Sequence, residues 1–211
     1  MIAVIDYGMG NLRSVAKAVE RVGGRARIVS EPEAVLAAEK IILPGVGAFA
    51  DAMAHLRERN LVDAIRQVIA EDRPVLGICL GLQLLFDVGW EDGRHEGLGI
   101  LGGKVIHFDF AGLPEAAALS VPHMGWNTLG WDRSDPMLDG VEPGSYVYFV
   151  HSYHVVPDDP AIEATCTDYG YRFTSSIRRG NLFACQFHPE KSQRVGLRMV
   201  ENFVSGRLAG Q

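Results

Sequence analysis

The stretch Pro74-Val-Leu-Gly-Ile-Cys79-Leu-Gly81-Leu-Gln83-Leu-Leu-Phe86 is the part of the sequence from which the fold is best predicted. Residues 75–78 form a short apolar run of the length that is typical of a buried strand. The apolar residues after Gly81 supply the surface that a helix needs to pack against a sheet. The stretch therefore predicts a strand, a sharp turn and a helix, with Cys79 at the turn.

Cys79 is a candidate nucleophile because of the glycines around it. Gly77 and Gly81 give the spacing Gly-x-Cys-x-Gly of a nucleophile elbow, in which a tight turn brings these two positions together. The turn holds the sulfur at a helix N-terminus, where free N–H groups favour the thiolate and can receive a developing oxyanion. The alternative is a small apolar residue at a strand end, since free cysteines are often buried. The local pattern leaves both interpretations open.

Length and composition indicate a globular protein. A chain of 211 residues suits one domain with a substantial core, or at most two small ones, and no linker divides it. We therefore expect a single domain over residues 1–211. The net charge of -6 and the lack of Lys/Arg runs interleaved with aromatic residues argue against binding to nucleic acid.

The cysteines and the N-terminus indicate the compartment. Cys79, Cys166 and Cys185 are widely spaced, so they form neither a disulfide framework nor a CxxC metal pair, and a reducing compartment is the default. The N-terminus has no basic segment of a signal peptide, and no apolar run reaches membrane-spanning length. We expect a cytoplasmic protein that does not bind membranes.

The first half of the chain alternates short apolar strands with helical stretches. Strands are expected at residues 2–5, 25–30, 41–43 and 75–78, and helices at 12–22, 33–38, 48–59 and 61–71. Continuous apolar strands that alternate with helices predict a parallel sheet covered on both faces. Asn11, the loop 44–47 and Cys79 fall at the carboxyl ends of these strands, where catalytic groups of such sheets lie.

The second half has a different pattern. Residues 90–103 and 109–120 read as loops around a strand at 104–108, with a possible helical turn at 114–119. Turn signals separate short strands that suggest antiparallel meanders, at residues 126–129, 146–150, 163–167, 174–177 and 182–186. An amphipathic helix is expected at 195–208. The predicted fold class is α/β, a mainly parallel sheet with helices on both faces and an antiparallel C-terminal extension.

A base for Cys79 is available near the C-terminus. In His188-Pro-Glu190 a carboxylate can accept the imidazole N–H, hold the tautomer and stabilise the imidazolium, which leaves the other nitrogen free to deprotonate a thiol. Alone, this tripeptide also reads as a surface turn at a strand end. Together with the elbow, the tripeptide is much stronger evidence of a catalytic site, because the two motifs supply a nucleophile, a base and a residue that orients the base.

The remaining candidates are weaker. His151 and His154 are three apart on a strand-like run and are expected to face opposite sides, and His123 adds no ligand pattern, so we expect no metal. Asp6 reads as a strand-end cap rather than a catalytic acid. Gly8-Met-Gly10 lacks the third glycine of a dinucleotide-binding fingerprint and reads as a turn, so no cofactor is expected.

The two motifs resemble those of the class I glutamine amidotransferases, in Gly77-Ile-Cys-Leu-Gly81 with Gln83 and in His188-Pro-Glu190. Within them, the chain is more closely similar to the family of glutaminase subunits of imidazole glycerol phosphate synthase, nearly end to end. The stretches that carry this similarity are Asp6-Tyr-Gly-Met-Gly-Asn11, Pro44-Gly-Val-Gly-Ala-Phe49, Pro122-His-Met-Gly-Trp-Asn127, Tyr148-Phe-Val-His-Ser-Tyr153 and Gln186-Phe-His-Pro-Glu-Lys-Ser192.

The resemblance implies hydrolysis of the glutamine side-chain amide by a Cys-His-Glu triad. Cys79 would attack the amide carbon, His188 would transfer the protons and Glu190 would orient His188. A thioester would form, and water would cleave it to glutamate.

The resemblance also implies the residues around the triad. Backbone N–H groups of Leu80 and of the Val46-Gly47 loop would hold the oxyanion. Gln83 and the backbone of Ser152 and Tyr153 would bind glutamine.

A partner is implied as well, namely a (β/α)8-barrel cyclase subunit that receives the ammonia through an interior channel. The pair would make imidazole glycerol phosphate and an aminoimidazole-carboxamide nucleotide in histidine biosynthesis. Asn11, Trp126 and Lys191 would lie on the docking face. Two rival interpretations are a stand-alone cysteine hydrolase of related fold and a non-catalytic regulatory or scaffold subunit.

Overall fold

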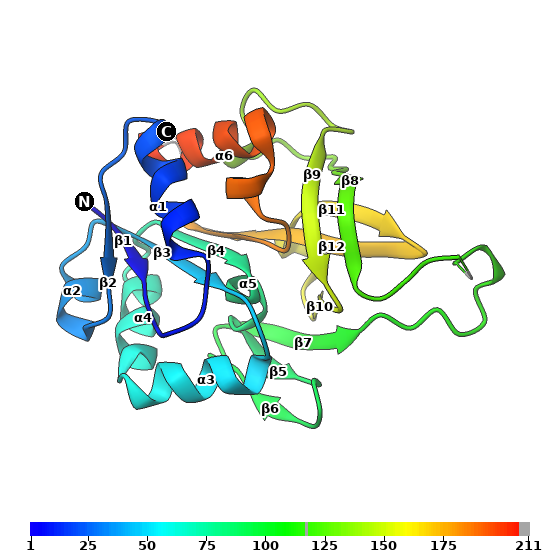
Figure 1. The fold of residues 1–211 in the computed structure, drawn as a ribbon, viewed down its shortest axis with the longest axis horizontal. Coiled ribbons are helices and arrows are strands. Elements are labelled where there is room, and N and C mark those ends of the chain that lie inside the picture. Colours follow the sequence, from blue (N-terminus) through cyan, green and yellow to red (C-terminus); the bar gives the residue numbers. More distant parts are fainter. Residues whose placement is uncertain (117, 207–211) are drawn as a thin grey trace.

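The computed structural model describes residues 1–116 and 118–206. Its first half forms the parallel sheet that the sequence predicts, with strands in the order β2-β1-β3-β4 (Figure 1). The strands are β1 (Ile2–Ile5), β2 (Ala26–Val29), β3 (Lys40–Gly45) and β4 (Val75–Cys79). The helices between them are α1 (Leu12–Arg21), α2 (Pro32–Leu36), α3 (Phe49–Glu58) and α4 (Leu61–Ala70).

Both faces of this sheet are covered by helices, because side chains alternate along each strand. On β1, Ala3 and Ile5 belong to one core cluster with α2, α3 and α4. Ile2 and Val4 belong to the other, with α1 and the C-terminal helix α6 (Gln193–Ser205). Figure 1 shows the two groups of helices on opposite sides of the strands. The predicted two-sided α/β architecture is confirmed.

The sheet continues in the order β4-β13-β12-β10-β7-β5-β6. In this part β13 is parallel to β4 and β5 is parallel to β7, and the other neighbouring strands are antiparallel. Its strands are β5 (Phe86–Gly89), β6 (His95–Glu96), β7 (Leu101–His107), β10 (Tyr153–Pro157), β12 (Tyr171–Arg179) and β13 (Leu182–Cys185), with β11 (Glu163–Tyr169) beside β12. A separate antiparallel pair consists of β8 (His123–Thr128) and β9 (Tyr146–His151). Short 3-10 turns complete the fold: η1 (Pro114–Ala116), η2 (Pro136–Leu138), η3 (Pro160–Ile162) and η4 (Pro189–Lys191).

Three expectations about this region are wrong. The helix after the elbow, α5 (Leu80–Gln83), is a single turn, because the chain rejoins the sheet at Phe86 and the carbonyls of Leu84 and Leu85 accept from residues 98, 100 and 101. The predicted loop 90–103 contains β6 and the start of β7. Strand β10 was not predicted. The helix expected at 195–208 is α6, and its predicted last two residues lie outside the described residues.

A corner at Ser152 joins the two sheets. β9 ends at His151 in the small sheet, and β10 begins at Tyr153 in the large one. The carbonyl of Ser152 accepts from the N–H of Phe108, which ties the corner to the end of β7. This corner turns the chain toward the carboxyl end of β4, where Cys79 lies.

Candidate active site

Cys79 ends β4 at a sharp turn. Its φ of 54° lies in the left-handed region, which is strained for a residue with a side chain. A Cβ at Gly81 would lie 1.9 Å from the carbonyl oxygen of Leu43, and a Cβ at Gly77 would lie 2.7 Å from the Cβ of Ala184. The neighbouring strands β3 and β13 therefore require glycine at both positions, and the carbonyl oxygen of Gly81, 3.1 Å from a Cβ at Gly77, gives the close contact that the elbow pattern predicts. Because α5 is one turn long, the dipole acting on the sulfur is smaller than that of a long helix.

Adjacent strands bring an imidazole to the same edge of the sheet. β13 pairs with β4 in parallel, with Cys185 opposite Ile78, so both strands deliver the residues after them to one place. His188 follows β13, and its Nδ1 lies 2.8 Å from Oε1 of Glu190 on η4. Both side chains of this pair are only 2% exposed. The structure thus places the three predicted catalytic residues together.

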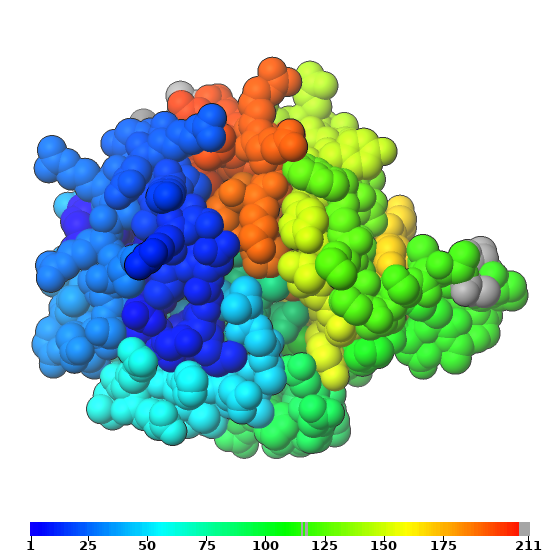
Figure 2. Space-filling view, viewed as in Figure 1, coloured from blue at the N-terminus to red at the C-terminus, as the bar shows by residue number. Residues whose placement is uncertain are grey.

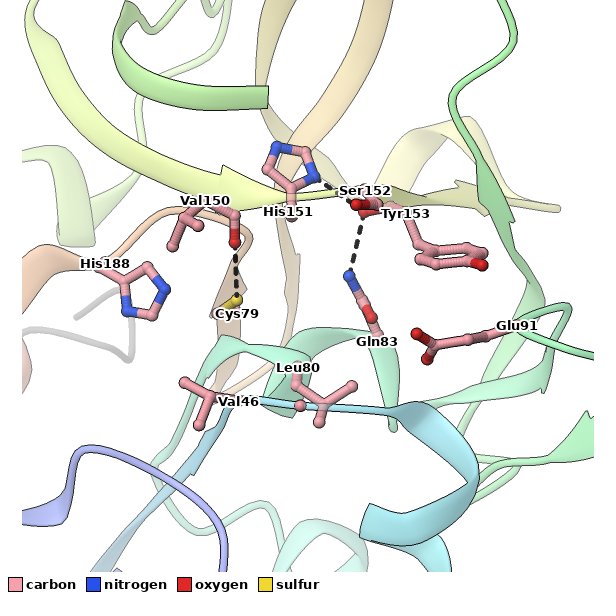
Figure 3. Close-up of a pocket in the computed structure, with 11 residues that line it drawn as sticks. Val46, Cys79, Leu80, Gln83, Glu91, Val150, His151, Ser152, Tyr153 and His188 are labelled. Atoms are coloured by element: carbon pink, nitrogen blue, oxygen red, sulfur yellow. Dashed lines mark hydrogen bonds between the residues drawn. The ribbon is translucent and has the colours of Figure 1, made fainter. Parts of the chain in front are cut away.

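The surroundings of His188 favour its protonated form. Burial alone lowers the pKa of this imidazole, but Cys79 and Glu190 outweigh burial and raise the pKa to about 9. Among the described residues, Nε2 of His188 has no hydrogen-bond partner, and the ring lies beside Cys79 (Figure 3). The thiol donates to the carbonyl of Val150 at 4.0 Å and accepts from the amide of Gln186 at 3.7 Å. An unused imidazole nitrogen beside a thiol, with a carboxylate on the other nitrogen, is suited to proton transfer.

A cavity of about 240 Å³ opens over Cys79 and His188. The predicted oxyanion residues Val46, Gly47 and Leu80 line it together with Cys79. The predicted substrate residues Gln83, Ser152 and Tyr153 also line it, together with Glu91, Val150 and His151 (Figure 3). Its size suits a small metabolite rather than a polymer.

Gln83 is held by the protein on one wall of this cavity. Its Nε2 donates to the carbonyl of Tyr153 at 3.1 Å and to Oε1 of Gln186 at 3.0 Å. Its position is therefore fixed before any ligand enters.

Two residues of the site were missed from the sequence. The Tyr7 ring is fully buried, and its hydroxyl donates to the carbonyl of Pro44 at 2.9 Å, which anchors the chain just before the Val46-Gly47 loop. Glu91 faces the cavity opposite Tyr153 and accepts from the N–H of Phe49 at 2.6 Å. No periodicity or motif marks either role, because both arise from tertiary contacts.

The predicted partner-contact residues lie near the site on the surface. Trp126 is 45% exposed and packs edge-on against Tyr148, with ring centroids 6.0 Å apart. Nζ of Lys191 lies 5.9 Å from the centroid of the same tyrosine ring. Asn11 precedes α1, whose residues line a groove with Glu190 and Lys191. Figure 2 shows α1 side by side with the segment 188–198.

The expectation for the other histidines is wrong. His151 and His154 do not face opposite sides, because the corner at Ser152 interrupts the strand, and both rings pack against Phe108, as does that of His123. His123 and His151 share a hydrogen bond of 3.0 Å.

Two kinds of feature are absent from the part of the chain that the structure describes. It contains no cluster of three or more His, Cys, Asp or Glu side chains that could hold a metal ion. None of its helices is long and apolar enough to span a bilayer.

Fold and site together define a class of protein. The family model for glutamine amidotransferase class-I matches residues 3–206, so the chain belongs to this family. A crystal structure of a glutamine amidotransferase has the same fold, with a TM-score of 0.73 and 19% identity over 97% of this chain and 98% of that one. The structure of PurLQS from Thermotoga maritima contains a chain that aligns with a TM-score of 0.70 and 18% identity over 97% of this chain and 95% of its own length.

More similar relatives place the chain within the family. Imidazole glycerol phosphate synthase subunit HisH of Rhodopirellula baltica is 54% identical over 97% of each chain. The protein of the same name from Aquifex aeolicus is 53% identical over 95% of this chain and 94% of its own. The chain therefore belongs to the HisH subunits of imidazole glycerol phosphate synthase. It is a glutamine amidotransferase subunit of that enzyme.

Proposed function

We propose that the chain hydrolyses L-glutamine to glutamate and ammonia with Cys79, His188 and Glu190 as its triad. With its raised pKa, His188 already holds the proton that the thiol gives up when the sulfur attacks the side-chain amide carbon, and it passes that proton to the departing nitrogen. A thioester remains on Cys79. Water, deprotonated by His188, then cleaves the thioester, which gives glutamate and restores the thiol. Glu190 keeps the imidazole oriented and stabilises its cation.

The observation that carries this proposal is that nucleophile and base share one cavity. Cys79 and His188 lie at the carboxyl ends of two paired parallel strands, and Glu190 contacts the imidazole nitrogen on the far side. A surface turn at a strand end would leave both side chains in water. Here the carboxylate lies 2.8 Å from the imidazole, and only 2% of either side chain is exposed.

The rest of the cavity fits the bound substrate. The N–H of Leu80 and those of the Val46-Gly47 loop stabilise the oxyanion, and each such donor is typically worth about 3 kcal/mol in the transition state. The backbone at Ser152 and Tyr153 binds the α-amino acid end of glutamine. Glu91, which faces the cavity opposite Tyr153, supplies a carboxylate for the α-ammonium group.

The ammonia passes to a cyclase subunit with a (β/α)8-barrel fold, which forms a heterodimer with this chain and receives the ammonia through a channel. Relatives named as subunits of one synthase support a partner of this kind. Docking uses the face around Asn11, Trp126 and Lys191. The products are imidazole glycerol phosphate and an aminoimidazole-carboxamide nucleotide of histidine biosynthesis. Residues 1–211 act as one domain in the cytoplasm, which suits three free thiols.

The test is glutamine hydrolysis measured with and without the cyclase subunit and its nucleotide ligand. Cys79→Ala should abolish hydrolysis, while the pair still forms imidazole glycerol phosphate from added ammonium. Cys166→Ala is the matched control and should keep full activity. Substantial glutamine turnover by Cys79→Ala would overturn the assignment of the nucleophile.

The same assay separates the rival functions. Efficient hydrolysis that ignores the cyclase and its ligand would indicate a stand-alone hydrolase. A wild-type chain that binds the cyclase without hydrolysing glutamine would indicate a regulatory subunit.

A further inference from the structure

A group of buried histidines beside the cavity has no part in the proposed chemistry. The rings of His123, His151 and His154 pack against Phe108 at centroid distances of 6.3, 5.2 and 4.8 Å. All three are almost completely buried. Burial lowers the pKa of His151 to about 3 and that of His123 to about 4, and it also lowers the pKa of His154. These imidazoles are therefore neutral at the pH of a cell, and each carries one N–H.

Neutrality fixes the direction of the hydrogen bonds in this group. The carbonyl of Tyr153 can only accept, so Nδ1 of His151 donates to it at 2.8 Å. Nε2 of His151 then has no proton and accepts from Nδ1 of His123 at 3.0 Å. Nε2 of His123 in turn accepts from the side-chain amide of Asn127 at 3.3 Å. Both histidines are therefore Nδ1–H tautomers.

The orientation of the Asn127 amide is set independently. Its oxygen accepts from the N–H of Thr128 at 2.8 Å, which assigns the other atom as nitrogen. That nitrogen also donates to the carbonyl of Asp168 at 2.9 Å. The series of bonds therefore has one allowed direction, from Asn127 through His123 and His151 to Tyr153.

The same carbonyl is bonded to the nucleophile side of the cavity. Tyr153 accepts from Gln83 as well as from His151 (Figure 3), and Gln83 and Gln186 continue the series to the sulfur of Cys79. Hydrogen bonds therefore connect the Tyr153 carbonyl to the histidines on one side and, through Gln83 and Gln186, to Cys79 on the other.

A side chain also holds the corner, besides the backbone bond from Phe108 to the carbonyl of Ser152. Ser152 lies between two sheets, outside the ladder of β9 and outside that of β10. Nδ1 of His151 bridges the corner to the residue two positions later, and His123 lies directly opposite His151 in the β8–β9 pair and holds its ring. Without these bonds the Tyr153 carbonyl, beside the cavity, would lose one of its two side-chain donors.

We propose that His151, supported by His123, is a positioning residue that holds the corner 151–153 in the geometry in which it binds glutamine. This inference rests on the proposed function, because the corner is taken to bind the α-amino acid end of the substrate. The residue acts through the Tyr153 carbonyl and not on the reacting atoms.

The test is a set of steady-state measurements on the chain with its cyclase subunit present. We expect His151→Phe to lower kcat/KM for glutamine about tenfold, mostly through a higher KM, as for the loss of one well-placed hydrogen bond. His123→Phe should lower it about threefold, because His151 keeps its bond to Tyr153. In His151→Asn the amide nitrogen replaces Nδ1, so this variant should restore most of the wild-type KM.

His154→Phe is the matched control. His154 is equally buried and stacks on the same Phe108, but its hydrogen bonds go to Val155 and Tyr171 and not to the corner. We expect its KM to stay within about twofold of wild type. The rate of Cys79 alkylation by iodoacetamide should be unchanged in all four variants, because this reaction does not use the substrate corner. An equal rise of KM in His151→Phe and His154→Phe, or no rise in His151→Phe, would overturn the proposal.

A second measurement needs neither a variant nor activity. In wild-type protein with 15N-labelled histidine, both His123 and His151 should appear as neutral Nδ1–H tautomers from pH 7.5 down to about 5.5. An Nε2–H tautomer at His151 would break the series and overturn the proposal, whatever the kinetics give. If the wild type does not hydrolyse glutamine, the proposed function fails, and the tautomers still decide whether the corner is held in this way.

Discussion

His188 and His151 are both buried, with exposed fractions of 2% and 6%, and both line the same cavity. Their pKa values are nevertheless shifted in opposite directions, to about 9 for His188 and to about 3 for His151. Burial disfavours the cation at both positions. The difference is in the neighbours of the two rings: Cys79 and the carboxylate of Glu190 on Nδ1 favour the His188 cation, whereas Nδ1 of His151 contacts the carbonyl of Tyr153.

This difference shows what makes a buried histidine able to carry a proton. A carboxylate compensates the cost of charging the ring, whereas a neutral carbonyl only fixes its tautomer. One cavity therefore holds an imidazole that can gain and lose protons and another that keeps a constant charge. The first suits catalysis and the second suits positioning.

The largest effect should come from removing the histidine that can be charged. His188→Ala leaves Cys79 without a base, and we expect glutamine turnover to fall about 10³-fold or more, as in other triads. Turnover is measured with the cyclase and its ligand present, and circular dichroism checks the fold. Activity within tenfold of wild type would contradict the assignment of the base.

The next change makes His188 resemble His151. In Glu190→Gln the ring of His188 keeps a hydrogen-bond partner but loses the neighbouring carboxylate charge, so its pKa should fall from about 9 toward the ordinary value, while Cys79 still raises it. We expect turnover to fall about 10- to 100-fold, less than in His188→Ala. Histidine NMR gives the pKa, and steady-state kinetics gives the loss. Full activity under activating conditions would remove Glu190 from the triad.

A change next to the Val46-Gly47 loop leaves both histidines intact. Tyr7→Phe removes the hydroxyl that holds the Pro44 carbonyl but keeps the ring in the core. We expect kcat to fall by up to about tenfold with KM unchanged, because the Val46-Gly47 loop loses its anchor. Alkylation of Cys79 by iodoacetamide, which forms no oxyanion, should proceed at the wild-type rate. A slower alkylation would mean that the hydroxyl acts on the thiol itself.

The pH dependence of stability also separates the two histidines. The pKa of His188 is raised on folding, so its contribution to stability is fully present below about pH 6.5 and is lost as the pH rises through about 9. Urea unfolding of wild type and Glu190→Gln at pH 6, 8 and 10 should show a stability difference that shrinks toward high pH. A difference that grows with pH would show that the pKa of His188 is not raised.

The smallest effect should come from the surface. Lys191 is adjacent to Glu190, so a partner bound there can act directly on the pair of His188 and Glu190. We expect Lys191→Ala to weaken stimulation by the cyclase ligand a few-fold and to change unstimulated turnover less, since exposed charges couple weakly. Affinity and stimulation are measured for Trp126→Ala in parallel. Wild-type values in both variants would place the docking face elsewhere.

The parallel half of the fold and the elbow could be predicted because their signals are local. Strands buried on both faces read as continuous apolar runs, and the spacing of Gly77 and Gly81 around Cys79 reflects a contact within one turn. The length of α5 could not be predicted, because apolar residues 82–86 suit a helix and a buried strand equally. Only the bonds that rejoin this segment to the sheet distinguish the two.

The histidine group shows a second limit of prediction from sequence. Alternation along a strand places residues 151 and 154 on opposite sides, but the change of sheet at Ser152 resets the alternation. Tyr7 and Glu91 are a third case, because their partners are distant in sequence and no spacing records such contacts. Cys79, His188 and Glu190, which the structure brings together, could be selected from the sequence, whereas the residues that support them could not.

The position of β13 between β4 and β12 affects the protein while it is being made. β4 leaves the ribosome about a hundred residues before β13, and until then one edge of this fully buried strand has no neighbour. Such an edge is prone to pair with other chains, so the nascent protein has a long interval in which it depends on chaperones or on fast synthesis. The same delay means that an unfinished chain carries Cys79 before it carries His188. The proposed hydrolysis therefore needs the chain to be synthesised through His188 and Glu190.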